Sequence, residues 1–553
     1  MAFSKTDPTD DVADGRGSTD SVGDRYEVLE TRMTQEELHD VVRAVLRGEV
    51  QPSAEIQVVR PDTCLTQLDG TRVEIRSRVM PQTTPGTLDH LCPAAERMQV
   101  LVSATDQLSE KATIMFDRLV ETLALRGERY TVAEENSIVG SMPLVALYAT
   151  DEPAFHNWAL IFRDHYVENS VGFLLGMERA GMAREWIFAL SKGDRTLHRD
   201  RVHSWFLDHG YLSDTLDNSV INGSDDAAAT AYAQGVNERV DTFIRQAHTA
   251  GRKVLVIDDG GLLAQGYGAR GVLDQHIDAA VELTVSGLKR IAGAPGELSI
   301  PVLNMARSRL KTMLGYNEIA DSCMRRLRAI LPGEKFIGQH VLLLGFGTLG
   351  ARMAHYLRVH GCRVSVVDTD ILALIAAAEH GYETYTSAAD ALRGHAPFLV
   401  VGTTGELALT PEDLPLLPDG AYLAGFATKD FSLLSEGFPG LRSTEVPFVG
   451  VRHTLPTGAT VTLLGDGRSL NLFEYEGIAN RGYDAYRAGT LIAAKTLCRE
   501  IDRLEPGLHL EPVDRAIDDA RLFSAYYQEY LARGGPCTGR GRPAEPLPTT
   551  AVA

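Results

Sequence analysis

Short apolar runs alternate with helical patterns along most of the chain, and this alternation predicts an α/β protein. The spacing is that of strands separated by helices, which implies right-handed βαβ units on parallel sheets. The fold class that we predict is α/β, with two doubly wound parallel-sheet (Rossmann-like) domains, a cleft between them and an N-terminal extension. The strand-like runs lie at 158–162, 186–190, 254–257, 300–303, 341–344, 364–367, 398–401 and 421–425.

The two ends of the chain lack any such pattern. Residues 1–25 are rich in Asp, Ser, Thr and Gly, and residues 534–553 are rich in Pro, Gly and Thr. Segments with so few large apolar groups cannot offset the entropy that is lost on ordering. We therefore expect both ends to be disordered tails.

Between these tails the pattern predicts three parts. Residues 26–150 form an N-terminal α/β extension that packs on the domain after it, with a helix at 35–46 and a strand at 73–79. Residues 151–320 form the first parallel-sheet domain, which helices within 480–533 complete, and residues 321–479 form the second. Further helices are expected at 233–250, 277–292, 317–331, 475–500 and 513–533.

Composition and charge narrow the class of protein. A chain of 553 residues is too long for one core, and 44% hydrophobic and 23% charged residues are ordinary for a globular enzyme. The net charge of −20 argues against binding to nucleic acid or to an anionic membrane, since phosphates would be repelled. We find no apolar stretch near about 20 residues long, so no membrane span is predicted.

Cysteine usage and the start of the chain predict a cellular location. The six cysteines are scattered, with no Cys-x-x-Cys pair, and no secretory signal is recognisable. Reduced thiols are typical of the cytoplasm, so we expect a cytoplasmic protein without a structural metal.

The most specific motif is a glycine turn between two apolar runs. The first run leads into the turn, a helical pattern follows, and the second run ends on an aspartate 18 residues after the last glycine. The three glycines permit the tight turn, the approach of a pyrophosphate and the packing of helix on strand, and the aspartate accepts hydrogen bonds from the adenosine ribose. A carboxylate there would repel a 2′-phosphate, which favours NAD over NADP. The predicted cofactor-binding residues are Gly345, Gly347, Thr348, Leu349, Gly350 and Asp368.

Polar residues follow three of the strand-like runs in the first parallel-sheet domain. They are His165, Ser191, and the pair Asp258 and Asp259, which two glycines follow. Ligands gather at the carboxyl ends of strands in such sheets, and glycine clears space for them. We therefore expect these residues to line one crevice.

Taken in order, these segments resemble the S-adenosylhomocysteine hydrolase family over roughly residues 156–480. The order and spacing of several strings carry the resemblance. The segment from Asp164 to Asn169 is similar to the family's His-x-x-x-Glu-Thr with the histidine displaced by one, and Leu283 to Gly287 is similar to its Glu-Thr-Thr-Thr-Gly. The remaining strings are Ile257-Asp-Asp-Gly-Gly261, Asn304 to Lys311, the glycine turn, Gly402-Thr-Thr-Gly405 and Gly467-Arg-Ser-Leu-Asn-Leu472.

The resemblance implies a tightly bound NAD that is used without net turnover. In the family the ribose 3′-hydroxyl is oxidised, a base removes the acidified C4′ hydrogen, the 5′ substituent leaves, water adds and the ketone is reduced again. Residues 151–320 would then bind substrate and 321–479 would bind NAD. By position, Asp259 matches the family carboxylate that faces C4′ and C5′, with Asp258 beside it and His165 as a further catalytic candidate. The family's other NAD contacts fall at Thr284, Ser286, Thr403, Thr404, Gly405 and Asn471.

The position of the catalytic lysine depends on the register. A gapless comparison from Asn304 places it at Arg309, whose guanidinium stays protonated and cannot act as a base. A small shift brings Lys311 into place, where burial near a cofactor would lower its pKa. We take Lys311 as the candidate base, with a solvated loop lysine as the alternative.

Several family positions hold different residues in this chain. They include the aspartate that pairs with the family lysine, two later histidines and a substrate-binding glutamate. The C-terminal Lys-x-x-x-Tyr that reaches a neighbouring subunit's NAD is not recognisable. The position of the family aspartate holds Met313 or Gly315. The positions of the two histidines hold Phe426 and Ile478, and the position of the glutamate holds Leu283, with Glu282 adjacent.

Three hypotheses of function follow. The first is an NAD-dependent hydrolase or lyase acting on an adenosyl thioether or related nucleoside, including a nucleoside 5′-dehydratase or lyase that stops after elimination. The second is a simple NAD-dependent oxidoreductase, and the third is an NAD-binding regulatory protein with weak catalysis. We expect a small-molecule nucleoside as the partner, and the resemblance implies a homo-oligomer, either a dimer or a tetramer.

Overall fold

The structure is a computed structural model of the chain. The chain divides into two units, Met1–Ser137 and Ile138–Ala553, which are described separately. The tails expected at 1–25 and 534–553 lie outside the described residues, apart from Arg25. The structure describes residues 25–532 except 32, 34, 51–54, 80–97, 105–106, 128–129, 131, 194–195, 217–226, 261, 263–274, 294–296, 428, 436, 447–448, 466–468 and 473–476.

The N-terminal unit is a five-stranded antiparallel sheet with the strand order β1-β5-β4-β3-β2. Every second residue of β5 is fully buried, as expected for a sheet with one face on a core. The helix predicted at 35–46 and the strand at 73–79 are confirmed as α1 and β4. The elements are β1 (Tyr26–Thr31), α1 (Gln35–Val45), the π-helical turn η1 (Leu46–Val50), β2 (Gln57–Arg60), β3 (Thr63–Leu68), β4 (Thr71–Val79), β5 (Met98–Ala104), α2 (Glu110–Gly127) and α3 (Val132–Gly140), which spans the boundary.

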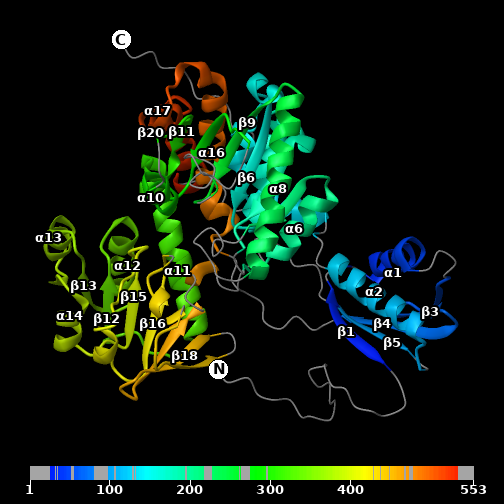
Figure 1. The fold of residues 1–553 in the computed structure, drawn as a ribbon, viewed down its shortest axis with the longest axis horizontal. Helices are drawn as coiled ribbons and strands as arrows, with labels where there is room; N and C mark the ends of the chain where they lie inside the picture. The colour runs from blue at the N-terminus through cyan, green and yellow to red at the C-terminus, as the bar shows by residue number, and fades with distance from the viewer. Residues whose placement is uncertain are drawn as a thin grey trace. The chain divides into compact units, whose positions relative to one another are not determined.

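The first sheet of the larger unit has seven strands in the order β20-β11-β10-β9-β6-β7-β8, and all neighbours are parallel. Figure 1 labels β6, β9, β11 and β20 of this sheet. The order reverses between β6 and β9, so the carboxyl ends of these strands form the switch point where such sheets bind ligands. The strands are β6 (Trp158–Asp164), β7 (Ile187–Ser191), β8 (Leu212–Thr215), β9 (Lys253–Asp258), β10 (Ala279–Glu282), β11 (Pro301–Asn304) and β20 (Gly507–His509).

Helices and short turns connect the strands of this sheet and lead to the second sheet. The central helix α16 is buried at every position from Tyr483 to Cys498. The helices are α4 (Pro143–Tyr148), α5 (Glu168–Arg179), α6 (Arg199–Asp208), α8 (Ala227–Thr249), α10 (Val285–Gly293), α11 (Tyr316–Ile330), α16 (Asn480–Glu500), α17 (Glu511–Asp519) and α18 (Leu522–Tyr526), with 3₁₀ turns η2 (Pro153–Asn157), η3 (Arg184–Trp186), η4 (Met305–Arg307) and η9 (Ile501–Arg503) and π-helical turns η5 (Lys311–Gly315) and η10 (Tyr527–Leu531).

Two predicted helices differ from the structure. The segment 277–292 begins as strand β10, because it lies between β9 and β11 and its backbone groups pair on both sides. The helix expected at 513–533 is divided into α17, α18 and η10. Arg521 has a φ of +55°, and a left-handed residue cannot continue a right-handed helix.

The second sheet of the larger unit has eight strands in the order β14-β13-β12-β15-β16-β19-β18-β17, of which the last two pair antiparallel. Its order reverses between β12 and β15, which places the glycine turn at the switch point. The elements are β12 (His340–Leu344), α12 (Thr348–Val359), β13 (Arg363–Val367), α13 (Ile371–Glu379), β14 (Glu383–Tyr385), α14 (Ala388–Gly394), β15 (Leu399–Gly402), η6 (Leu414–Leu416), β16 (Ala421–Gly425), α15 (Ser432–Ser435), β17 (Arg442–Val446), β18 (Gly450–Thr454), β19 (Thr460–Leu464) and η8 (Leu470–Leu472).

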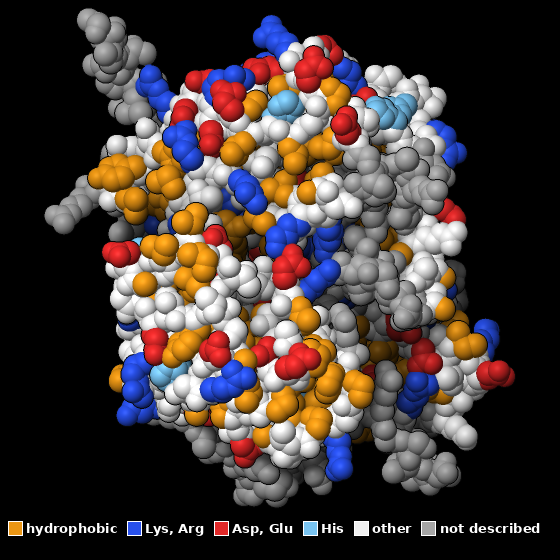
Figure 2. All heavy atoms as spheres, turned by 60° about the vertical axis from the view of Figure 1, so that its left-hand side comes forward, with side chains coloured by type: hydrophobic (Ala, Val, Ile, Leu, Met, Phe, Trp, Pro, Cys, Tyr) orange, Lys and Arg blue, Asp and Glu red, His pale blue; other side chains and the backbone are white. Residues whose placement is uncertain are grey.

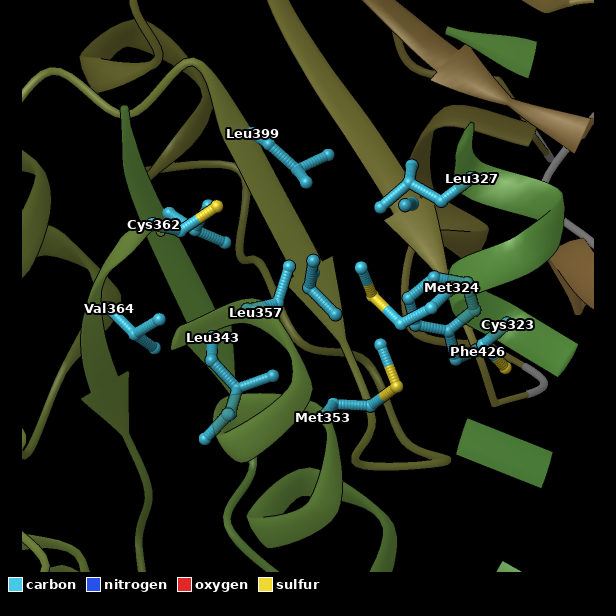
Figure 3. Close-up of a cluster of buried hydrophobic side chains, with 14 of the residues drawn as sticks. Cys323, Met324, Leu327, Leu343, Met353, Leu357, Cys362, Val364, Leu399 and Phe426 are labelled. Carbon is cyan, nitrogen blue, oxygen red and sulfur yellow. The ribbon is translucent and has the colours of Figure 1, made fainter. Parts of the chain in front are cut away.

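Helix α11 covers one face of this second sheet. Figure 3 shows Met324 and Leu327 of α11 in the same buried cluster as Leu343 of β12 and Met353 and Leu357 of α12. Burial of these side chains fixes the helix that follows the glycine turn against its strand.

The predicted α/β class with parallel, doubly wound sheets is confirmed by these two strand orders. On the face drawn in Figure 2, acidic and basic side chains are interspersed among apolar ones. Within the described residues, no helix has both the length and the apolar content that crossing a bilayer requires.

Candidate functional site

The ends of β6, β7 and β9 bring a carboxylate and two basic side chains together. Asp259 follows β9, and its Oδ1 atom accepts a hydrogen bond from Nζ of Lys192, which follows β7. His165 follows β6, with Nε2 at 3.7 Å from the same Oδ1 and at 3.4 Å from Nζ of Lys192. Ser191, the predicted residue beside Lys192, is buried, and its Oγ accepts from the backbone of Gly193.

The charge state of Asp259 follows from this arrangement. Burial alone would raise the pKa of its carboxyl, but the charges of Lys192 and His165 hold that pKa well below the ordinary value. Asp259 is therefore a buried, ionised carboxylate, and the side-chain nitrogens of Lys192 and His165 lie close to it.

Two buried arginines support these strand ends. Arg163 of β6 donates from Nη1 to Oδ1 of Asp258 at 3.5 Å, and both side chains are fully buried. Arg487 of α16 donates from Nη1 to Oδ2 of Asp164 at 2.5 Å. Asp258 and Asp164 thus anchor the strands, while Asp259 carries the carboxylate that the two basic side chains contact.

Lys311 points into the protein from the π-helical turn η5. Its Nζ donates to the hydroxyl of Tyr483 at 2.9 Å and lies 4.0 Å from the centre of the Tyr486 ring. Gly315 makes room for the lysine stem, because a Cβ there would lie 2.9 Å from Cδ of Lys311. Burial lowers the pKa of Lys311 to about 8, although the charge of Asp259 opposes the shift.

Arg309 and Lys311, the two candidate positions for the family lysine, differ in exposure and contacts. The Arg309 side chain is 51% exposed and pairs with Asp514 and Asp518 of α17. Met313, one of the positions predicted for the family aspartate, is exposed, and the other is Gly315. Lys311 therefore faces the protein interior without a carboxylate from either of those positions.

Glu282 lies behind this crevice at the end of β10. Its Oε1 accepts from the backbone N and from Oγ1 of Thr284 at 2.8 and 2.9 Å, while Oε2 is buried and has no hydrogen-bond partner among the described residues. Burial, followed by the charge of Asp258, raises the pKa of Glu282 well above its ordinary value. Ser286 lies with Oγ at 3.2 Å from Oγ1 of Thr284. The adjacent Leu283 is an apolar core residue.

The glycine turn has the geometry that a dinucleotide requires. Gly345 has a φ of +94°, and a Cβ on Gly350 would lie 2.1 Å from the carbonyl oxygen of Gly345. A Cβ on Gly347 would meet no atom within 4 Å, so the space above the turn is open. Thr348 and Leu349 begin helix α12, and the N-terminus of a helix attracts anionic groups such as phosphates.

Asp368 and the loop after β15 frame the same turn. Asp368 accepts from the backbone N of Phe346 at 2.6 Å, and Thr403 donates from Oγ1 to the carbonyl of Gly345 at 2.9 Å. Thr404 and Gly405 donate to Oδ1 of the buried Asp430, and Asn471 is buried and accepts from Ser469. The open space at Gly347, the helix N-terminus and the carboxylate at 368 fit a bound NAD.

The structure brings together His165, Asp259 and Lys311 in one charged neighbourhood, and groups the glycine turn with Asp368, Thr403, Thr404 and Gly405. It adds Lys192, which sequence reasoning missed. Its signal was its position directly after a buried strand, next to the predicted Ser191.

Comparisons with known proteins agree with this description. Residues 315–477 match the family model described as S-adenosyl-L-homocysteine hydrolase, NAD binding domain. A curated adenosylhomocysteinase from Gloeothece citriformis (strain PCC 7424) is 27% identical over 278 residues, which are 48% of this chain and 63% of that protein. The match thus spans less than two thirds of the relative.

Solved structures resemble the chain more weakly. A dipicolinate synthase subunit from Bacillus halodurans is 14% identical with a TM-score of 0.34, over 62% of this chain and 99% of that one. A 2-hydroxyacid dehydrogenase from Ketogulonicigenium vulgare is 12% identical with a TM-score of 0.33, over 64% and 98%. Because both scores are below 0.5, the fold assignment rests on the strand orders given above.

Over residues 315–477 the chain is therefore similar to the NAD-binding domain of S-adenosyl-L-homocysteine hydrolases, and this similarity supports NAD as its cofactor.

Proposed function

We propose that this adenosylhomocysteinase-like chain oxidises the 3′-hydroxyl of a nucleoside ribose transiently and eliminates the 5′ substituent, with NAD held between turnovers. The observation that carries the proposal is Lys311, a buried amine whose pKa is lowered to about 8. An amine of that pKa has an appreciable neutral fraction near neutral pH, which a general base needs.

The chain's residues divide the proton transfers among them. Neutral Lys311 takes the proton of the 3′-hydroxyl and holds it as an ammonium, which donates a hydrogen bond to the Tyr483 hydroxyl and returns the proton when the ketone is reduced. When bound, NAD supplies the hydride acceptor for the ribose and later returns the hydride. The glycine turn and Asp368 hold its pyrophosphate and adenosine ribose.

In this proposal Asp259 positions two basic side chains. With its pKa held low it is a weak base, but it fixes Lys192 and His165 side by side at the strand ends. His165 is then placed to take the proton from C4′, and Lys192 is placed to give a proton to the 5′ leaving group. The unpartnered Oε2 of Glu282 supports a polar ligand at the same edge of the sheet.

A lyase variant is favoured by a separate observation. The positions that match two later family histidines hold apolar residues, Phe426 and Ile478, and Phe426 is only 3% exposed in the core of the NAD-binding sheet. Without those imidazoles, the chain lacks two side chains that could activate water for its addition at C5′. The reaction would then stop after elimination and reduction, as in a nucleoside 5′-dehydratase or lyase.

One experiment separates these functions. The bound nucleotide of the purified protein is identified by mass spectrometry, and adenosine or S-adenosylhomocysteine is added while reduced nicotinamide absorbance and products are followed. Transient NADH with product and no net cofactor use supports the proposal, and an unsaturated product identifies the lyase variant. Stoichiometric NADH accumulation indicates a simple oxidoreductase, and tight NAD without turnover indicates a regulatory protein; either result overturns the proposal.

The division of the chain and its assembly belong to the same proposal. Residues 151–320 with 480–533 would bind an adenosyl thioether or related nucleoside, 321–479 would bind NAD, and the protein would be a cytoplasmic homo-oligomer. Light scattering on the purified protein measures the assembly state, and a monomeric mass removes that part of the proposal.

A further inference from the structure

Two histidines and a glutamate meet at the edge of the NAD-binding sheet opposite to the glycine turn. His340 is the first residue of β12, Glu383 is the first residue of β14, and His395 directly follows α14. One ligand-type atom from each side chain lies within 4.8 Å of the others. The glycine turn begins after the last residue of β12, so a ligand at this cluster and a bound dinucleotide are at opposite ends of the strand.

The donor set is that of a transition-metal site. Imidazole nitrogen and carboxylate oxygen are the ligands that Zn²⁺ takes besides thiolate, and three protein ligands leave a position for water. Ligand atoms around a tetrahedral zinc lie roughly 3.4 Å apart, given its usual bond lengths. The His395 and Glu383 ligand atoms are closer than this, so they would have to move apart by roughly 0.6 Å to hold an ion.

The side chains of the cluster already contact one another. Nε2 of His395 lies 2.8 Å from Oε2 of Glu383. The two imidazole rings stack with their centres 4.3 Å apart, which disfavours a charge on both.

Neighbouring residues orient the cluster as outer-shell groups orient metal ligands. Oγ of Ser365 donates to Oε2 of Glu383 at 3.0 Å and lies 2.8 Å from Nε2 of His340. The Tyr385 hydroxyl donates to Oε1 of Glu383 at 2.7 Å. Because the serine proton is given to Glu383, Nε2–H of His340 donates to Oγ of Ser365. Nδ1 of His340, which is buried and has no hydrogen-bond partner among the described residues, is then the ring nitrogen with a free lone pair.

We propose that His340, Glu383 and His395 form a binding site for a divalent transition-metal ion of the Zn²⁺ class, separate from the NAD and substrate sites. The ion would join the starts of β12 and β14 to the end of α14. A second group with suitable ligands, Asp164, His165 and Asp259, already holds the ammonium of Lys192 against its carboxylate. That second group therefore already binds a basic side chain. The proposed metal site is elsewhere, so it does not depend on the reaction proposed for Asp259.

The test uses the full-length, tag-free protein with its bound nucleotide. After treatment with a chelator it is titrated with Zn²⁺ by calorimetry and with Co²⁺ by visible absorption. We expect one Zn²⁺ per chain, affinity lowered by roughly 100-fold or more in H395A and E383Q, and by roughly 10-fold in S365A. The matched control is H380A, because His380 is an exposed histidine of the same domain whose ring Nδ1 lies against the carbonyl of Ala376 in its own helix.

The outcomes are decisive in both directions. Saturable binding that is weakened in H395A and E383Q and unchanged in H380A and H165A supports the site. No binding, binding unaffected in H395A and E383Q, or binding lost in H165A overturns it. If H395A does not fold, the wild-type Co²⁺ spectrum and S365A decide: a nitrogen- and oxygen-ligated band that S365A weakens supports the site, and its absence overturns it.

Discussion

At the scale of single residues, two buried lysines have different surroundings. Lys311 lies among tyrosines, and loss of water lowers its pKa because the charged form is the more heavily solvated one. Lys192 lies against the Asp259 carboxylate, and that pairing helps to keep the buried carboxylate ionised. The first arrangement favours proton acceptance, and the second favours a fixed pair of charges.

Lys311 should make turnover depend on pH. The neutral amine fraction increases as pH rises through about 8, so ribose oxidation should increase from pH 7 to 9 and then level off. K311A should abolish transient NADH while NAD remains bound. The control is R309A, which removes an exposed side chain that pairs with Asp518 and should leave turnover within about twofold. Unchanged turnover in K311A would exclude Lys311 from the mechanism.

The same lysine also affects stability with a defined sign. Its folded pKa is below the usual value near 10.4, so between about pH 8 and 10.4 the unfolded state binds more protons than the folded state. The contribution of this group to the free energy of unfolding therefore rises with pH across that window.

Lys192 should matter to stability as well as to turnover. K192M leaves the Asp259 carboxylate buried without its ammonium partner, which costs about 3 kcal/mol of unfolding free energy. The double variant K192M/D259N should recover much of that loss, since the uncompensated charge is gone. Denaturant unfolding measures both, and K289M is the control because Lys289 is 46% exposed. Equal stabilities of wild type and K192M would contradict a coupled pair.

At the scale of elements, the two glycines of the turn have separable tasks. Gly350 lies against the carbonyl of Gly345, where any side chain forces strand and helix apart, whereas the space at Gly347 is open in the protein itself. Packing and cofactor space are therefore set by two positions three residues apart.

This difference predicts opposite results for two alanine variants. G347A should unfold like wild type but bind NAD about 10- to 100-fold more weakly, because the new methyl group occupies cofactor space at a cost of about 1–3 kcal/mol. G350A should lose both stability and NAD. Thermal unfolding without ligand and a titration with NAD measure the two effects. A G347A protein with wild-type NAD affinity would show that the turn does not contact the pyrophosphate.

The sequence predicted this motif because strand, turn, helix and acid are local and each has its own pattern. It could not predict Lys192, because the contact with Asp259 joins the ends of β7 and β9, which are far apart in the chain. The choice between Arg309 and Lys311 for the family lysine was left open. Lys311 begins the π-helical turn η5, and such a turn changes the number of residues per helical turn. Strand β10 was predicted as helix because pairing on both sides, and not its own periodicity, holds it extended.

At the scale of the whole molecule, the chain contains two units with their own cores. The antiparallel sheet of the N-terminal unit closes on α1 and α2, and the parallel sheets belong to the unit that starts at Ile138. A unit with its own core can fold by itself.

A chain that begins at Val132 should therefore retain NAD. It keeps α3 whole, since α3 extends across the boundary and Ile138 lies near Gly172 in α5. We expect cooperative unfolding and an NAD affinity within about threefold of the full chain, measured by calorimetry. Aggregation or loss of NAD would show that the larger unit depends on the first 131 residues.

The edge strand β20 has a consequence for the order of synthesis. It pairs with β11 and follows α16, so the ribosome completes the entire dinucleotide-binding sheet before it supplies the last strand and the central helix of the other sheet. A chain that ends at residue 480 contains every strand of the dinucleotide-binding sheet but leaves the edge of β11 unpaired. Premature termination at this stage yields a polypeptide that holds NAD and exposes a sheet edge, which is a state prone to aggregation.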